Sequence, residues 1–275
     1  MKGPGLYSDI GKKAKDLLTR DYNYDQKFSI STCTASGLGL TSTAVKKGRL
    51  YTADVGSQFK YNQSTVDVKF DANSNISSTI TVSEIFPSTK AIATIKFPDA
   101  NSGKLELQHF HHHAGFSSSV GLKQFPTIDV SATIGAHGVT FGAEAAFDTA
   151  SKAFTKYGAG LSLTKDSYVA SLILENKGDA LRASYMHHID KKQKICIVKE
   201  FTRKFSSNEN IVTVGGSYAL DNQTTVKARL NNNGKLGALI QHELKPKSTL
   251  TLSGEFDTKA MEQHPKFGLA LALKP

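Results

Sequence analysis

The chain of 275 residues has no tryptophan, only two cysteines and no long apolar run. Its longest apolar stretch, residues 267–273, is far shorter than the ~20 residues that a membrane-spanning helix needs. Cys33 and Cys196 form no C-x-x-C pair and have no disulfide-framework spacing, which fits a reduced compartment. No seven-residue apolar core follows Lys2, so we expect no secretory signal peptide. Because its apolar stretches are so short, the sequence also predicts no transmembrane helix.

Motifs that would indicate an enzyme are also missing. The sequence has no G-x-S-x-G nucleophile motif, no phosphate-binding lysine loop and no G-x-G-x-x-G ahead of a helix. We therefore expect neither an enzymatic activity nor a cofactor. Thirty-four Lys and Arg against 24 Asp and Glu give a net charge of +10, which indicates anionic partners. Because these basic residues are spread along the chain and do not cluster with aromatics, no nucleic-acid-binding surface is expected.

From about residue 26 onward, apolar and polar residues alternate strictly, which is the pattern of β-strands. Residues 127–134, for example, place Ile128 and Val130 on one face and Asp129 and Ser131 on the other. Turn-forming clusters follow at intervals of roughly 8–15 residues, and connections this short join antiparallel neighbours. The chain is thus predicted to be all-β, a meander of about nineteen strands, in which the alternation is weakest near residues 77–97 and 190–201.

Such a sheet protects its two edges either in a soluble multi-sheet protein or by closing into a membrane barrel. In the soluble protein the apolar face forms the core, whereas in the barrel it meets lipid and the polar face lines a water-filled lumen. A sheet this wide cannot be filled by side chains, its apolar face is uniform, and its aromatics gather mostly at strand ends, as in interfacial girdles. These aromatics are Phe59, Tyr61, Phe116, Phe147, Tyr168, Tyr185, Tyr218 and Phe267. The barrel is favoured, and a soluble β-rich binding protein for anionic ligands is the alternative.

Residues 6–20 break the alternation and predict a short amphipathic helix. Ser8 or Asp9 can cap its start, and Gly11 weakens its middle. Its acidic residues, among them Asp16, argue against a cleaved organelle presequence, which leaves a helix on the membrane surface or one inside the lumen. Because a wide polar lumen has room for it, we predict that the helix lies in the lumen. The apolar stripe of this helix consists of Leu6, Ile10, Ala14, Leu17 and Leu18.

We divide the chain into an N-terminal segment, residues 1–25, and a transmembrane β-barrel, residues 26–275. Residues 21–25 contain no glycine that could act as a hinge. The helix is therefore expected to be held at its C-terminal end by the first strand and to be freer at its N-terminal end.

One histidine cluster is a candidate metal site. His109, His111 and His113 share one strand face, although no Cys or carboxylate follows at the spacing of a metal site. A turn must fall between about His112 and Gly115. We therefore expect an exposed turn cluster and no metal site.

The opening of the chain, residues 4–20, resembles that of the eukaryotic mitochondrial porins, the voltage-dependent anion channels, and most of all their plant-type members. Residues 218–240 resemble the late-strand signature of that family, and residues 266–273 its closing strand. The resemblance implies a barrel of nineteen strands in which the first and last strands pair in parallel. It also implies an integral protein of the mitochondrial outer membrane. It also implies passage of ATP, ADP, phosphate and chloride, and voltage gating linked to the N-terminal segment. It allows a homo-oligomer, and cytosolic proteins that dock at the outer membrane.

If the polar face lines the lumen, its basic residues outnumber its acidic ones, and the pore attracts anions. The candidate pore-lining and selectivity residues are Asp9, Lys12, Lys15, Asp16 and Arg20 in the helix, and Lys60, Lys96, Lys123, Lys227, Arg229 and Lys266 in the barrel.

Overall fold

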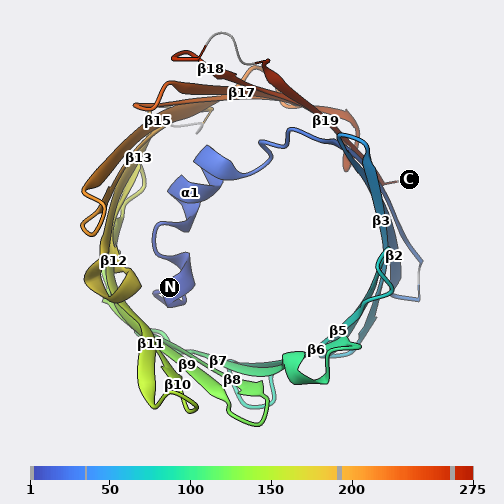
Figure 1. Ribbon diagram of the computed structural model, residues 1–275, viewed down its shortest axis with the longest axis vertical. Helices are drawn as coiled ribbons and strands as arrows, with labels where there is room; N and C mark the ends of the chain where they lie inside the picture. The colour runs from blue at the N-terminus through green and yellow to red at the C-terminus, as the bar shows by residue number, and fades with distance from the viewer. Residues whose placement is uncertain (1–2, 35, 191–193, 261–263, 275) are drawn as a thin grey trace.

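The computed structural model describes residues 3–34, 36–190, 194–260 and 264–274. Nineteen strands form one closed sheet around a lumen, and a short helical segment lies inside it (Figure 1). The helical segment consists of a 3₁₀ turn, Tyr7–Asp9, and helix α1, Lys12–Thr19. The strands are β1 Gln26–Cys33, β2 Leu38–Lys47, β3 Leu50–Tyr61, β4 Ser64–Asp71, β5 Ile76–Ser83, β6 Thr89–Phe97, β7 Gly103–Phe110, β8 Ala114–Leu122, β9 Thr127–Ala136, β10 Val139–Asp148, β11 Ala153–Thr164, β12 Tyr168–Glu175, β13 Ala180–His188, β14 Ile195–Lys204, β15 Glu209–Ala219, β16 Thr224–Asn231, β17 Lys235–Lys245, β18 Ser248–Asp257 and β19 Lys266–Leu273.

The barrel closes between its first and last strands. β1 runs parallel to β19, from Gln26 opposite Leu269 to Ile30 opposite Leu273, and every other neighbouring pair is antiparallel. This follows from the odd number, because strands that alternate in direction leave the first and the nineteenth pointing the same way. The predicted all-β barrel, its nineteen strands and the parallel closure are confirmed.

The two faces of the sheet differ as the alternation predicted. Val198 of β14 is fully buried against helix α1, so its face of the strand points into the lumen, while its neighbour Ile197 points outward. In β9 the inward Thr133 is 1 % exposed and the outward Val130 is 38 % exposed. Large apolar side chains are exposed all around the outer wall, which is the surface that a barrel presents to lipid. No helix among the described residues is long and apolar enough to cross a membrane.

The helical segment differs from the single helix predicted over residues 6–20. Gly11 adopts a left-handed conformation, with φ of 70°, and separates the 3₁₀ turn from α1. A Cβ atom on Gly11 would lie 2.9 Å from the Ser171 Oγ, so the chain also comes too close to the wall there for any other residue. Capping differs too, since the Asp9 carboxylate accepts a hydrogen bond from the Leu6 N–H at 3.1 Å, within the 3₁₀ turn.

Two smaller expectations can be compared with the strands. Tyr185 lies in the interior of β13, not at a strand end, whereas Tyr168 and Tyr218 lie at or next to the ends of β12 and β15. The chain turns between β7 and β8 at residues 111–113, where three exposed histidines stand in a row.

Candidate functional site: the lumen and its N-terminal segment

The N-terminal segment, residues 3–25, lies along one part of the lumen wall and leaves the wall of β2 to β6 uncovered (Figure 1). Helix α1 packs on β13 to β16, and the 3₁₀ turn packs on β9 and β10. The lumen is therefore asymmetric, with the segment on one side and open space on the other.

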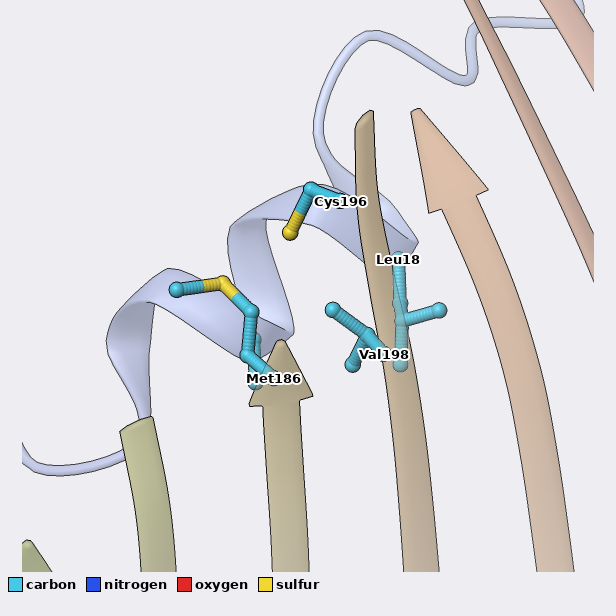
Figure 2. Close-up of a cluster of buried hydrophobic side chains, with 5 residues drawn as sticks. Leu18, Met186, Cys196 and Val198 are labelled. Atoms are coloured by element: carbon cyan, nitrogen blue, oxygen red, sulfur yellow. The ribbon is translucent and has the colours of Figure 1, made fainter. Parts of the chain in front are cut away.

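Apolar side chains hold the helix to the wall. Ala14 and Leu18 pack on Met186, Cys196 and Val198 in one buried cluster (Figure 2). Leu18 is only 2 % exposed, and burial of a leucine contributes about 1.5–3 kcal/mol. The predicted apolar stripe thus faces an apolar patch of the inner wall.

A second, smaller cluster holds the 3₁₀ turn. Tyr7 and Ile10 pack on Ile173 of β12. Burial raises the pKa of the Tyr7 phenol to about 12, and the nearby carboxylates of Glu144 and Glu175 add to the shift. The Tyr7 phenol is therefore neutral at physiological pH.

Glycines on the inner wall give the segment room to come close. A Cβ on Gly142 would lie 3.0 Å from the Tyr7 ring, and one on Gly215 would lie 2.6 Å from Leu18 Cδ2. A Cβ on Gly237 would lie 3.3 Å from the Tyr22 ring. Because real Cβ atoms essentially never approach within 3 Å, the seat of Leu18 requires glycine at position 215.

The N-terminal end of the segment is packed as well, contrary to the expectation that it is freer. Thr133 Oγ1 donates a hydrogen bond to the Gly5 carbonyl at 2.6 Å. A Cβ on Gly115 would overlap the same Gly5 carbonyl, and one on Gly3 would overlap the His111 carbonyl. The segment is therefore held at both ends, because small residues of β8 and β9 accept its backbone.

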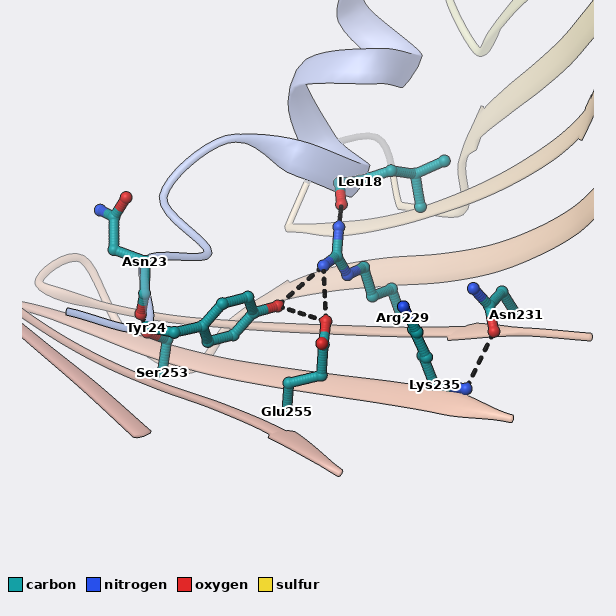
Figure 3. A network of polar contacts seen from close by, with 8 residues as sticks. All are labelled: Leu18, Asn23, Tyr24, Arg229, Asn231, Lys235, Ser253 and Glu255. Carbon is teal, nitrogen blue, oxygen red and sulfur yellow. Dashed lines mark hydrogen bonds and ion pairs between the residues drawn. The ribbon is translucent and has the colours of Figure 1, made fainter. Parts of the chain in front are cut away.

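At the C-terminal end, Arg229 of β16 joins helix, connecting segment and wall (Figure 3). Its guanidinium donates hydrogen bonds to the Leu18 carbonyl at 2.6 Å, the Tyr24 hydroxyl at 2.8 Å and the Glu255 carboxylate at 3.1 Å. The guanidinium carbon also lies 4.4 Å from the centre of the Tyr22 ring. A cation at a helix C-terminus is favourable because the last carbonyls carry partial negative charge.

Two tyrosines complete this junction. Burial raises the pKa of Tyr22 to about 12, and burial together with the hydrogen bond to Glu255 raises that of Tyr24 to about 12. The Tyr24 hydroxyl donates to the Glu255 carboxylate at 2.6 Å. Next to them, the Lys227 ammonium lies 3.2 Å from the Asp21 carboxylate.

A cavity of about 650 Å³ lies between the segment and the wall. Charged residues of both signs line it. Those of the segment are Lys12, Lys15 and Asp16, and those of the wall are Lys104, Glu106, Asp129, Glu144, Lys156, Glu175 and Arg182. The wall charges pair with one another, at 2.7 Å for Lys156 and Glu144 and at 2.9 Å for Arg182 and Glu175. Lys12 and Lys15 are thus basic groups that line this cavity.

The structure places the predicted pore-lining residues in three groups. Lys12, Lys15 and Asp16 line the cavity, Asp9 pairs with Lys12 at 3.5 Å, and Arg20 ends α1. Lys227 and Arg229 contact the N-terminal segment directly. The other four are Lys60 in β3 and Lys96 in β6 on the inward phase, Lys123 just after β8, and Lys266 at the start of β19.

Several contributors to this site were not singled out from the sequence. Tyr22, Tyr24 and Asp21 anchor the connecting segment, and glycines on the polar phase of the strands seat it. Residues 21–25 lie outside the alternating pattern and contain two tyrosines, and this could have indicated that the connecting segment is anchored.

The comparisons agree with this architecture. A family model described as eukaryotic porin matches residues 3–268. The chain is 60 % identical over 275 residues to mitochondrial outer membrane protein porin 5 of Oryza sativa subsp. japonica, which covers 100 % of the chain and 99 % of the relative. It is 60 % identical over 274 residues to mitochondrial outer membrane protein porin 2 of Arabidopsis thaliana, with the same coverage. It is also 50 % identical over 275 residues to an outer plastidial membrane protein porin of Pisum sativum, which covers all of both chains.

A solved structure, a mutant of Rh. blastica porin, shares the fold. Its TM-score is 0.52 at 10 % identity, and the match covers 81 % of this chain and 89 % of the other. At this identity the likeness concerns the barrel alone.

Proposed function

The chain belongs to the eukaryotic porin family, and on that premise we propose that it is a voltage-gated, weakly anion-selective diffusion pore of the mitochondrial outer membrane. Small ions and anionic metabolites such as ATP and ADP are its solutes. Family membership and the outward apolar wall overturn the alternative of a soluble binding protein.

The observation that carries the proposed selectivity is the position of Lys12 and Lys15, which the N-terminal segment adds to one side of the lumen. Among the described residues Lys15 lines the cavity without an ion-pair partner within 4 Å, and Lys12 pairs with Asp9 of the same segment, whereas the wall residues Glu144 and Glu175 pair with Lys156 and Arg182. Uncompensated positive charge raises the local concentration of anions, and salt weakens the effect once the Debye length falls to ~10 Å.

The proposed gating element is the N-terminal segment, residues 1–25, within the barrel of residues 26–275. It occupies one side of the lumen, and its displacement changes the free cross-section of the pore (Figure 1). The segment contacts the wall at separate places: two apolar clusters, the glycines against which it packs, and the Arg229 junction.

The location follows from the relatives. The two at 60 % identity are named as porins of the mitochondrial outer membrane, and the pea relative at 50 % is named as plastidial. Import into isolated mitochondria and isolated plastids, followed by extraction with alkaline carbonate, tests the assignment. Carbonate-resistant protein in plastids and none in mitochondria contradicts it.

The functional test is the reversal potential of the purified protein in a planar bilayer under a gradient of potassium chloride. We expect large channels that favour chloride at low salt and lose the preference as salt rises, because the lumen charges are screened. Replacement of both Lys12 and Lys15 by Gln is expected to shift the reversal potential toward that of potassium. A pore that prefers cations in its open state rejects the proposed selectivity.

A further inference from the structure

One lysine side chain points to the lipid-facing side of the barrel wall and not into the pore. Lys199 is the fifth residue of β14, Ile195–Lys204, and its side chain is exposed. Its neighbours Val198 and Glu200 lie on the inward phase with Cys196, beneath helix α1. Successive side chains of a strand point to opposite faces, so Lys199 points outward between Ile197 and Phe201.

This position is exceptional in the barrel. In the described strands, the other outward-pointing Lys and Arg side chains lie next to a strand end, as Lys46 does in β2 and Arg203 in β14. Lys199 stands near the middle of its strand, where a lysine on the lipid face costs about 2–4 kcal/mol. An ionisable residue at such depth is rarely retained without a partner.

The partner cannot be an acidic residue of the same barrel wall. Every Asp and Glu within the described strands lies on the inward phase, as the cross-strand pairs show for Asp54, Glu106, Asp129, Glu175 and Glu255. The same observation argues against a second copy of this chain as the source of a counter-charge, because its strands offer no outward carboxylate either. Among the described residues no carboxylate forms an ion pair with Lys199 within 4 Å, and the other anion next to this wall is the phosphate of a lipid.

The surroundings of Lys199 suit a headgroup phosphate. Its cross-strand partner on β13 is Tyr185, which stacks with His187 at 6.2 Å between ring centres and lies 5.9 Å from the Tyr168 ring. Tyrosine and histidine combine an apolar body with a polar tip and mark the zone between hydrocarbon and headgroups. This aromatic cluster extends from Lys199 to the rim of the barrel. The four-carbon stem of the lysine can extend in the same direction, toward the rim.

We propose that Lys199, with Tyr185 and His187, forms an external binding site for the phosphate of an acidic phospholipid. The ammonium supplies the charge, and the phenol and imidazole supply hydrogen-bond donors. The lipid is drawn toward the barrel at this point, and the site operates whether or not the lumen selects anions.

The absence of tryptophan makes a direct test available. Val214 lies on β15 directly opposite Lys199 and is exposed on the outer wall, so a Val214→Trp variant carries a single tryptophan beside the site. The protein is reconstituted in phosphatidylcholine vesicles that contain brominated phosphatidylglycerol, or brominated phosphatidylcholine as reference, and quenching gives the relative association constant of the two lipids. We expect a preference of about fivefold for phosphatidylglycerol, the size expected for one lysine near a membrane surface.

Matched variants isolate the lysine. Lys199→Met in the same background is expected to bring the ratio close to one without loss of assembly, since it removes a charge from the lipid face, and Lys199→Arg is expected to keep the preference. Lys46→Met removes a distant outward lysine and is expected to leave the ratio unchanged. Equal association of both lipids with the parent, or a preference that survives Lys199→Met, overturns the site. So does a change of oligomeric state on Lys199→Met with no change in the lipid ratio, because it identifies a protein contact.

Discussion

The Arg229 guanidinium donates a hydrogen bond to the Leu18 carbonyl at 2.6 Å, which ties strand β16 to the last turn of helix α1. The two residues are 211 positions apart in the chain. Leu18 is at the same time the apolar anchor of the helix, so one residue joins the polar and the apolar attachment of the segment.

Arg229→Gln is expected to loosen the C-terminal end of the segment. The change removes the bond to Leu18 and leaves Glu255 with Tyr24 as its remaining partner, at a cost of about 1–3 kcal/mol for groups left without partners. We expect more frequent closure at a given voltage and a smaller anion preference in planar bilayers.

The matched control is Lys60→Gln, which removes one positive charge from the uncovered wall without touching the segment. It is expected to lower the anion preference and to leave the voltage dependence unchanged. If both variants gate as the parent does, the junction does not restrain the gate.

Gly215→Val is expected to displace the helix from its seat. A Cβ at this position comes within 2.6 Å of Leu18, whereas one on Gly56 of β3 finds no atom nearer than 3.8 Å. Cys196 lies buried beneath the helix and Cys33 is exposed, so maleimide labelling of Cys196 in a Cys33→Ser background reports displacement. We expect labelling at least tenfold faster in Gly215→Val and unchanged in Gly56→Val; equal rates in the two variants contradict the seat.

The apolar stripe of Ala14 and Leu18 could be read from the sequence because its spacing depends only on the helix itself. The wall residues that receive it, such as Met186 and Val198, could not, because they lie about 170 residues further on and their choice depends on where the closed barrel places the segment. Gly11 was expected to weaken the helix. The helical segment is interrupted at Gly11, and the close approach of the wall at this residue could not be read from the sequence.

The strands show the same division. Periodicity predicted the inward and outward faces of β9 correctly, because a strand shows its faces in its own sequence. Near residues 190–201 the pattern is weak, and Lys199 on the outward face of β14 is part of the reason. A residue that serves a lipid contact there interrupts the alternation by which the strand is recognised.

Alkaline pH is expected to weaken the docking of the segment. The docked phenols of Tyr7, Tyr22 and Tyr24 have pKa values of about 12, against about 10 for a free tyrosine. Docking favours the protonated phenols. The free energy that these phenols contribute to docking is therefore fully present below about pH 10 and is lost as the pH rises from about 10 to about 12. Spectrophotometric titration of tyrosinate in detergent micelles is expected to show a late component, which disappears when residues 1–24 are deleted. A titration that is identical for both proteins contradicts the raised pKa values.

Val130→Lys is expected to impair membrane assembly far more than Ser131→Lys. Val130 is on the outer face of β9 and Ser131 on the inner face, where an ammonium stays hydrated. A lysine at mid-depth on the lipid face costs about 2–4 kcal/mol. Folding yield into phosphatidylcholine vesicles measures the difference, and equal yields for the two variants show that the faces are not chemically distinct.

Deletion of residues 1–20 is expected to leave an inserted barrel, since β1 begins at Gln26 and its pairs with β2 and β19 involve no residue of the deleted part. The deletion removes Lys12 and Lys15 from the cavity and clears one side of the lumen, so conductance rises and anion preference falls. It also exposes Met186, Cys196 and Val198 to water, and we therefore expect fast labelling of Cys196 and a noisier open state. Single-channel recording at low salt measures conductance and selectivity together. A truncated protein that conducts, selects and closes as the full chain does shows that the segment is not part of the pore.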